Sequence, residues 1–154
     1  MNKIKLIVFD VDGTLTDGKI YIGPSGEVMK AFCAHDAIGV RKLSNYGIVP
    51  IIITGRESNI VNIRAKEMNV DEVYQNVDDK LKKLSEIVSK KKINYDEIAY
   101  VGDDENDFEC MDKCGFCACP SDAVDKIKEK CDYISKYKAG EGAVRDIVEF
   151  IIKE

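Results

Sequence analysis

The protein has 154 residues, of which 45% are hydrophobic and 33% charged, and its formal net charge is −5. A chain of this length buries roughly two-thirds of its unfolded surface, so we expect one domain over residues 1–154. The negative charge disfavours nucleic acid as a partner, because phosphate backbones require a basic face. No apolar run approaches the roughly 20 residues of a membrane span, and the N-terminus lacks signal-peptide features. We therefore expect a cytoplasmic protein that binds neither nucleic acid nor membranes.

Strand-like and helix-like segments alternate from the N-terminus onward. The run IKLIVFD, residues 4–10, is apolar and rich in β-branched residues, which is typical of a strand buried on both faces. Two short strand-like stretches around Pro24 and Gly26 predict a β-hairpin over about residues 19–31. A helix is predicted from Asp36, which we expect to be its N-cap, and Gly47 lies beyond its end.

The alternation continues through the rest of the chain. Residues 48–53 predict a second buried strand, and residues 57–69 predict a helix with Ile60, Ile63 and Met68 on its apolar face. The remaining predicted strands cover residues 71–75, 98–104, 115–119 and 132–135, and the remaining helices cover 79–92, 107–114, 122–131 and 142–154. This pattern predicts an α/β fold, a Rossmann-like parallel sheet with helices on both faces.

Four of the six cysteines lie close together, at Cys110, Cys114, Cys117 and Cys119. The C-x-x-C pair within this group can bind zinc or take part in redox chemistry. A closed zinc site usually needs a second pair or histidines, and the only histidine is His35. Free cysteine also packs as a small apolar residue in strands. We interpret the group as core packing, with metal or redox chemistry as the alternative.

Polar residues follow three of the predicted buried strands. The three clusters are Asp10 with Asp12, Thr54 with Gly55 and Arg56, and Gly102 with Asp103 and Asp104. Because ligands bind outside the carboxyl ends of strands in an open parallel sheet, we expect one site to collect all three clusters. Lys80, at the start of a predicted helix, is placed to join them.

The residue types in these clusters indicate phosphoryl transfer. Converging carboxylates need a cation, and hard oxygen ligands suit Mg²⁺, while a carboxylate can also act as a nucleophile. A hydroxyl, backbone amides beside a glycine and a lysine suit phosphate oxygens. Helix N-capping is the simpler interpretation, and we expect it for Asp36 and Asp78. It does not explain the two acid pairs, because one cap needs only one acid.

With these residues placed, the sequence resembles the phosphatases of the haloacid dehalogenase superfamily. The first family motif, D-x-D-G-[TV], is matched at residues 10–14, and the fourth, G-D-D-x-x-D, at residues 102–107. Thr54 matches the second motif, and Lys80 matches the third. All four motifs occur in order, and the resemblance spans nearly the whole chain.

The resemblance implies a role for each matched residue. Asp10 would attack phosphorus and form an aspartyl-phosphate, and Asp12 would protonate the leaving alcohol and then activate water. The Asp10 carboxylate, the Asp12 backbone carbonyl and the Asp103 carboxylate would hold Mg²⁺, with Asp107 in support. The implied substrate-binding residues are Thr54, Gly55, Arg56, Lys80, Glu141 and Arg145, of which Thr54 and Lys80 would hold the phosphoryl oxygens.

A closer resemblance is to the small capless phosphatases of 3-deoxy-ulosonic acid phosphates. It rests on DGTLTDG, HDAIGVRKL, VGDDENDFECM and the tail KAGEGAVRDIVEF. The group that acts on 3-deoxy-D-manno-octulosonate 8-phosphate usually has Arg where this chain has Glu141, whereas relatives acting on nine-carbon acids tend to have Glu. Arg56 is similar to the residue at this position in the octulosonate group, and we favour the octulosonate 8-phosphate as the substrate. The alternatives are a phosphatase of nonulosonate (KDN or N-acylneuraminate) 9-phosphates and a non-catalytic assembly or regulatory domain of sialic-acid activation.

The sequence leaves no room for the cap domain that covers the active site in most relatives. Only the hairpin and one helix separate Asp12 from Thr54. The hairpin carries Ile20, Ile22 and Met29, more apolar surface than a lone exposed hairpin tolerates. Resemblance to the family implies a homotetramer in which paired hairpins and a neighbouring subunit supply the cover; the alternative is that the hairpin folds onto its own domain.

Overall fold

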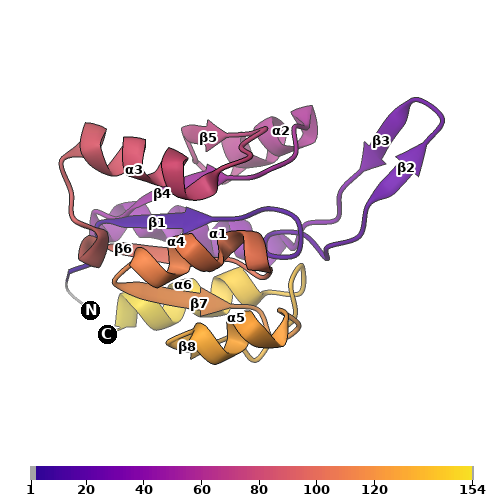
Figure 1. The fold of residues 1–154 in the computed structure, drawn as a ribbon. Coiled ribbons are helices and arrows are strands. Elements are labelled where there is room, and N and C mark those ends of the chain that lie inside the picture. The colour runs from indigo at the N-terminus through magenta and orange to yellow at the C-terminus, as the bar shows by residue number, and fades with distance from the viewer. Residues whose placement is uncertain (1–2, 154) are drawn as a thin grey trace.

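A six-stranded sheet forms the centre of the protein, and the computed structural model describes residues 3–153 (Figure 1). The strands are β1 (Leu6–Phe9), β4 (Val49–Ile53), β5 (Glu72–Tyr74), β6 (Ile98–Val101), β7 (Phe116–Cys119) and β8 (Tyr133–Ile134). Their order is β5-β4-β1-β6-β7-β8, and each neighbouring pair is parallel. The predicted α/β fold with a parallel sheet is therefore confirmed.

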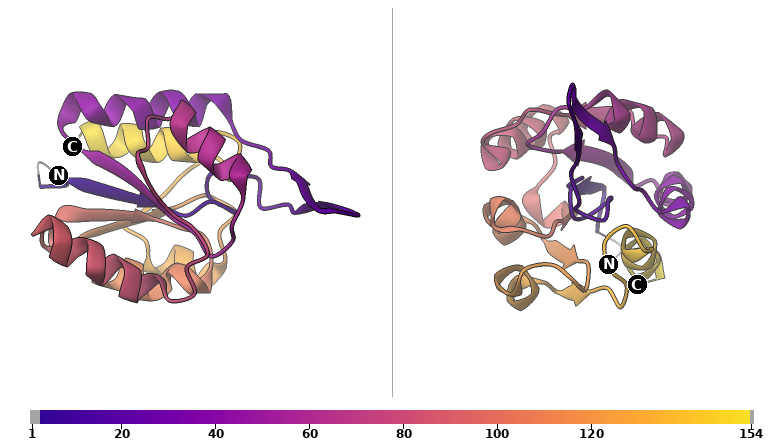
Figure 2. Two further views of the ribbon diagram at one scale, coloured as in Figure 1. Left: turned by 90° about the horizontal axis from the view of Figure 1, so that it is seen from above. Right: turned by 90° about the vertical axis from the view of Figure 1, so that its right-hand side faces the viewer.

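Helices cover both faces of this sheet (Figure 2). One face carries α1 (Ala34–Lys42), α2 (Asn59–Glu67) and α6 (Ala143–Lys153), and the other carries α3 (Lys80–Lys91), α4 (Phe108–Lys113) and α5 (Asp125–Lys130). Because successive side chains of a strand point to opposite faces, β1 contributes Ile7 and Phe9 to the first core and Leu6 and Val8 to the second. Burial on both faces explains the continuous apolar sequence of β1. Within residues 3–153, none of the helices has the length and apolar character needed to cross a membrane.

Short 3₁₀ turns connect several of these elements. They are η1 (Leu43–Tyr46), η2 (Tyr95–Glu97) and η3 (Glu105–Asp107). Gly47 ends the first of them in the left-handed conformation, as its predicted place beyond the helix requires. The strand order puts β4 and β6 on either side of β1, so the three polar clusters follow three neighbouring strands.

The predicted hairpin is present and projects away from the sheet (Figures 1 and 2). Its strands are β2 (Tyr21–Gly23) and β3 (Gly26–Met29), which pair antiparallel and are shorter than the sequence predicts. The exposed fractions are 71% for Ile22, 56% for Val28 and 55% for Met29. Within residues 3–153, the hairpin and α1 with η1 are the elements between β1 and β4, so no cap domain covers the site there.

Three local predictions are wrong. Asp36 does not cap α1 but lies inside it, buried, because α1 begins at Ala34. The N-cap of α3 is Asp79, whose carboxylate accepts a hydrogen bond from the Lys82 backbone, and not Asp78. The buried face of α2 consists of Val61 and Ala65, followed by Met68, whereas the predicted core residue Ile63 is 56% exposed.

The cysteine group lies mainly in the core between the sheet and helices α3 to α5. Cys110, Cys117 and Cys119 are buried there, and Cys114 packs against the same cluster. The Cys117 backbone N–H donates to the Asp132 carboxylate at 2.8 Å. These contacts agree with the core-packing interpretation.

Candidate active site

Three carboxylates converge beyond the carboxyl end of the central strands. Asp10 follows β1, Asp103 follows β6, and Asp107 ends η3. One oxygen from each lies within 4.8 Å of the others. The turn after β1 allows this approach because Gly13 has a φ of +86°, and the Asp103 carboxylate occupies the space where a Cβ at residue 13 would lie. The glycine of the first motif therefore has a steric role in the site.

A buried lysine links two of these carboxylates. Lys80 is the first residue of α3, and its ammonium donates to Asp10 Oδ1 and to Asp107 Oδ1, both at 2.8 Å. The side chains of Lys80, Asp10 and Asp107 are 2%, 7% and 0% exposed. Their ion pairs are therefore largely shielded from solvent. Charges interact more strongly in such a shielded site than at the surface.

Burial and like charge shift the acid–base equilibria of this group. Burial, followed by repulsion from Asp107, raises the pKa of Asp10 to about 6, although the Lys80 ammonium opposes the change. Burial also raises the pKa of Asp103 to about 8, with contributions from the charges of Asp10 and Asp107. Burial alone would lower the pKa of Lys80, but the two carboxylates outweigh it and hold that pKa above its ordinary value. The three carboxyl groups can therefore carry more negative charge than the single ammonium of Lys80 neutralises.

Neighbouring hydroxyl groups orient the acids. Thr14 Oγ1 donates to Asp103 Oδ1 at 2.9 Å, and the buried Tyr100 hydroxyl donates to Asp107 Oδ1 at 2.8 Å. The backbone N–H of Asp103 also donates to Asp107 Oδ2 at 3.2 Å. Neither Thr14 nor Tyr100 has a role that is predicted from the sequence. Thr14 lies in the first motif, whereas Tyr100 reads as an ordinary residue of a buried strand.

Residues from each of the three polar clusters line one cavity of about 300 Å³. Its lining residues are Asp10, Asp12, Gly13, Gly18, Thr54, Gly55, Arg56, Asp103, Asp104 and Asn106. Thr54 is buried, and its backbone N–H pairs with the Tyr74 carbonyl at 2.9 Å, which continues the pairing of β4 with β5 beyond the strand. The expectation that one site collects residues from all three strand ends is therefore met.

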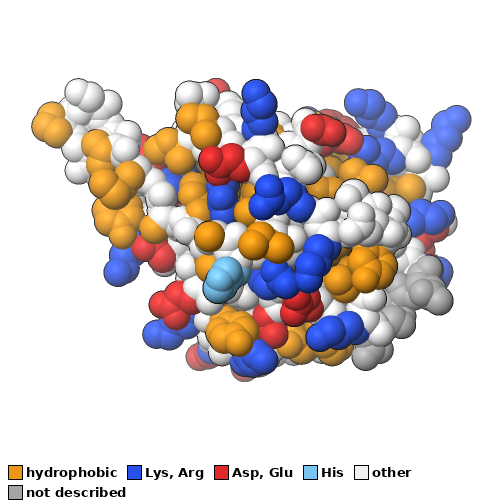
Figure 3. All heavy atoms as spheres, turned by 180° about the vertical axis from the view of Figure 1, so that it is seen from behind, with side chains coloured by type: hydrophobic (Ala, Val, Ile, Leu, Met, Phe, Trp, Pro, Cys, Tyr) orange, Lys and Arg blue, Asp and Glu red, His pale blue; other side chains and the backbone are white. Residues whose placement is uncertain are grey.

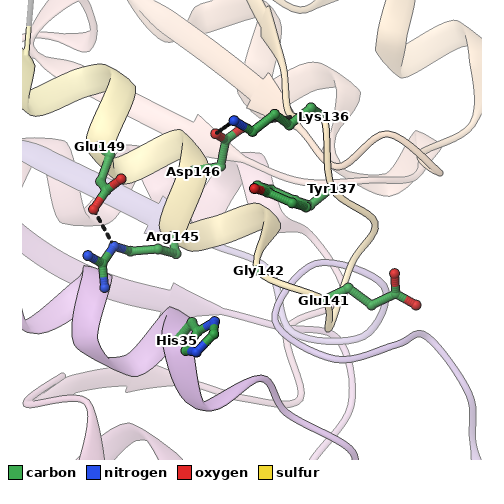
Figure 4. Close-up of a pocket in the computed structure, with 8 residues that line it drawn as sticks. All are labelled: His35, Lys136, Tyr137, Glu141, Gly142, Arg145, Asp146 and Glu149. Carbon is green, nitrogen blue, oxygen red and sulfur yellow. Dashed lines mark hydrogen bonds and ion pairs between the residues drawn. The ribbon is translucent and has the colours of Figure 1, made fainter.

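Glu141 and Arg145 lie in a different cavity of the same chain, of about 600 Å³ (Figure 4). It is lined by residues of the loop before α6, of α6 itself and by His35 of α1. The Arg145 guanidinium contacts Glu149 there, and its backbone N–H donates to the Asp36 carboxylate at 2.8 Å. Within one chain, these two sugar-site candidates are not among the residues that line the carboxylate cavity.

Asp12 is held from the hairpin side. Lys30 follows β3, and its ammonium donates to Asp12 Oδ1 at 2.6 Å and lies 2.9 Å from Glu27 Oε2. Arg56 Nε lies 4.0 Å from Asp12 Oδ2. Neither Lys30 nor Glu27 is identifiable as a site residue from the sequence, because both are isolated charges in a predicted hairpin. Only the fold brings them to the acid.

A parallel sheet whose central strands end in converging carboxylates, a buried lysine and a threonine defines a Rossmann-like enzyme of phosphoryl transfer. Residues 51–147 match the model of the haloacid dehalogenase-like hydrolase family. The chain belongs to this family, and it is a phosphatase.

Named relatives agree with this assignment. The chain is 36% identical to the 3-deoxy-D-manno-octulosonate 8-phosphate phosphatase of Escherichia coli over 97% of its own length and 79% of the relative's. The enzyme of that name from Yersinia pestis is also 36% identical, over 97% of this chain and 80% of that one.

Solved structures match the whole fold. The enzyme of the same name from Moraxella catarrhalis, solved in complex with magnesium ion, phosphate ion and a KDO molecule, superposes with a TM-score of 0.94. It is 38% identical and is matched over 99% of this chain and 87% of that one. The cobalt-bound phosphatase from Haemophilus influenzae has a TM-score of 0.94 at 27% identity, over 99% and 89% of the two chains.

Proposed function

We propose that the protein is a Mg²⁺-dependent phosphomonoesterase that hydrolyses 3-deoxy-D-manno-octulosonate 8-phosphate through an aspartyl-phosphate on Asp10. The observation that carries this proposal is the position of Asp10, at the carboxyl end of the central strand, in contact with Lys80 and close to two further carboxylates. The names of the relatives support the substrate. They also favour an enzyme over the non-catalytic domain considered from the sequence.

The donor set of the site fits a magnesium ion. Three carboxylates within 4.8 Å supply the hard oxygen ligands that Mg²⁺ prefers, and their excess negative charge needs a cation. Asp10 and Asp103, with the backbone carbonyl of Asp12, would hold the ion, and Asp107 would support it. When bound, Mg²⁺ would offset the repulsion between the carboxylates and the phosphate dianion.

The reaction has two steps, and the residues of this chain divide the work. In the first, an Asp10 oxygen bonds to phosphorus, the bond to the sugar oxygen breaks, and Asp12 gives that oxygen a proton. In the second, Asp12 takes a proton from water, the water oxygen bonds to phosphorus, and the bond to Asp10 breaks. Thr54 and Lys80 hold the phosphoryl oxygens while the negative charge is redistributed among these oxygens. Inorganic phosphate leaves, and Asp10 and Asp12 return to their starting states.

The open site requires a cover, which we propose is a neighbouring subunit in a homotetramer. The projecting hairpin exposes Ile20, Ile22, Val28 and Met29, and such a patch marks an interaction surface. Figure 3 shows the hairpin extending from the body of the protein with hydrophobic side chains along it. A neighbour seated there would exclude water from the site and contact the sugar. Glu141 and Arg145 remain our candidates for sugar contact.

A substrate comparison tests the proposed function. The purified protein should hydrolyse octulosonate 8-phosphate with a higher kcat/KM than nonulosonate 9-phosphates, should lose activity with EDTA and should regain it with Mg²⁺. Glu141→Arg should move the preference further toward the eight-carbon acid if Glu141 contacts the sugar. A higher kcat/KM for a nine-carbon acid in the unmodified protein would replace the proposed substrate. Activity that persists without a divalent cation would contradict the proposed cofactor.

A further inference from the structure

The contact between Lys30 and Asp12 joins the hairpin to the proposed general acid. The Lys30 side chain is only 1% exposed, although the residue lies where the projecting hairpin returns to the body of the protein. Its ammonium contacts two carboxylates, Asp12 Oδ1 at 2.6 Å and Glu27 Oε2 at 2.9 Å. Burying a lysine is costly unless it is paired, so these two partners fix where the ammonium can lie.

Glu27 is fixed in its turn by the loop that follows β4. The Ser58 hydroxyl donates to Glu27 Oε1 at 2.7 Å, and Arg56 Nη2 lies 3.7 Å from Glu27 Oε2. Two acids and two bases therefore form one network across the hairpin, the turn after β1 and the loop after β4. Surface ion pairs are usually weak. The Lys30–Asp12 pair differs from them because the Lys30 side chain is buried and because Glu27, its other partner, is itself held by Ser58.

The network restrains one oxygen of Asp12, and Asp12 is one of the residues that line the carboxylate cavity. Lys30 donates to the Oδ1 atom of Asp12, and Arg56 Nε lies 4.0 Å from the Oδ2 atom. Proton transfer to a leaving oxygen requires the acid within hydrogen-bond reach and correctly oriented. An unrestrained aspartate would have to lose its rotational freedom during each turnover.

We propose that Lys30 is a positioning residue for Asp12, and that Glu27 on the hairpin strand β3 holds Lys30 in place. The proposal rests on the proposed role of Asp12 as the proton donor to the leaving oxygen. It makes proton donation depend on the hairpin, because both Lys30 and Glu27 belong to that segment. A purely structural ion pair would hold the hairpin without any preference for one step of the reaction.

The dependence of the rate on the leaving group separates the two roles. Phenyl phosphate has a more basic leaving oxygen than 4-nitrophenyl phosphate, so its cleavage depends more on proton donation. Lys30→Met should lower kcat/KM for phenyl phosphate about 10-fold more than for 4-nitrophenyl phosphate, in the direction of Asp12→Asn. Because both substrates are measured on the same protein, a loss of folded enzyme lowers both rates equally and leaves their ratio unchanged.

Two further variants complete the design, each compared by the ratio of kcat/KM for phenyl phosphate to kcat/KM for 4-nitrophenyl phosphate. Lys30→Arg keeps the positive charge, so its ratio should stay near that of the wild type. Glu27→Gln keeps an acceptor for Ser58, but its ratio should shift in the same direction as that of Lys30→Met. Lys91→Met is the matched control, since Lys91 pairs with Glu72 outside this network, and its ratio should stay at the wild-type value.

The outcomes that contradict the proposal are distinct from those that contradict the proposed function. Equal losses on both substrates in Lys30→Met, or no loss on either, would overturn the positioning role alone. If Asp10→Asn kept wild-type activity toward 4-nitrophenyl phosphate, the proposed mechanism would fall, and the role of Lys30 with it.

Discussion

Lys80 Nζ lies 2.8 Å from Asp10 Oδ1 and also 2.8 Å from Asp107 Oδ1, in surroundings almost closed to solvent. The ammonium joins the first residue of α3 to the end of β1 and to η3. It therefore stabilises the arrangement of three separate segments and also supplies positive charge next to the proposed nucleophile. A substitution here should affect both stability and chemistry.

Replacing Lys80 should lower the free energy of unfolding far more than replacing a surface lysine does. Lys80→Met leaves two buried carboxylates without their cation, which costs about 3–5 kcal/mol of unfolding free energy for pairs of this kind. Lys83→Met, on the same helix, removes a partly exposed ion pair with Glu86 and a cation–π contact with Tyr74, and it should change stability much less. Urea unfolding of both variants checks this. Similar midpoints for the two would contradict the energetic role of Lys80, and full activity in Lys80→Met would contradict its role toward phosphate.

The two acids of the first motif should differ in how much activity their loss removes. Asp10→Asn should abolish turnover, because an amide is a poor nucleophile. Asp12→Asn should lower the rate toward octulosonate 8-phosphate by about 10²- to 10⁴-fold, the usual scale for removal of general acid–base catalysis. Initial rates with Mg²⁺ present measure both, with the exposed-site variant Asp112→Asn as control. Turnover by Asp10→Asn within a few-fold of wild type would exclude the aspartyl-phosphate mechanism.

The hairpin should govern assembly and substrate choice together. Serine at both Ile20 and Ile22 should dissociate the proposed tetramer, and the dissociated protein should lose far more activity toward the sugar phosphate than toward 4-nitrophenyl phosphate. The reason is that Asp10, Asp12 and Asp103 all belong to one chain, whereas sugar contacts and water exclusion would come from the neighbour.

Light scattering and kinetics on both substrates measure these effects. Ile63→Ser is the matched control, because Ile63 is an exposed isoleucine of α2 and does not belong to the hairpin. A monomer that retains its preference for the sugar phosphate would show that each chain covers its own site.

Asp36 should make stability depend on pH. Burial raises the pKa of this carboxyl to about 6 from an ordinary 3.8, although the hydrogen bond from the Arg145 backbone opposes the change. The folded protein therefore holds the proton to higher pH than the unfolded chain. The contribution of Asp36 to stability is full below about pH 3.8 and is lost as the pH rises through about 6.

Asp36→Asn stays neutral and keeps an acceptor for Arg145. Its unfolding free energy should therefore rise relative to wild type between pH 3 and 7.5, by about 3 kcal/mol in total, which is the free energy equivalent of the pKa difference. Urea unfolding across this pH range measures the difference in unfolding free energy, with Asp71→Asn at an exposed position as the control. A constant difference for Asp36→Asn would mean that the carboxyl titrates normally in the folded state.

The cysteines should be free of stoichiometric metal if they serve as core packing. Cys117 and Cys119 lie among apolar side chains of the second core. Burial raises the pKa of Cys110 to about 12 and holds the pKa of Cys114 above its ordinary value, which disfavours the thiolates that bind metal, whereas a hydrogen bond with Cys131 lowers the pKa of Cys117. Elemental analysis of the purified protein should find no zinc or iron near one equivalent per chain. One equivalent that disappears in a variant lacking Cys114 and Cys117 would overturn this interpretation.

Several local features escaped sequence reasoning for identifiable reasons. Asp36 resembled an N-cap because it precedes an apolar segment, but α1 begins two residues earlier and the carboxylate instead accepts from the backbone of α6. Ile63 matched helical spacing, yet Val61 and Ala65 define the buried face of α2, because the position of the helix on the sheet decides which face is covered. Periodicity identifies a helix more reliably than it identifies the side of the helix that packs.

The sequence by itself determined the alternation of strands and helices, the hairpin, and the acids and threonine at three strand ends. Those features are local: apolar runs, turn residues and short motifs act over a few positions. Only the tertiary structure decided that Lys80 bridges Asp10 and Asp107, that Lys30 reaches Asp12, and that Glu141 lines another cavity. Those relationships join residues that are distant in sequence or belong to separate elements, so they depend on how the elements pack. Where packing shields charges from solvent, as at Lys80, pairing between them is strongly favoured.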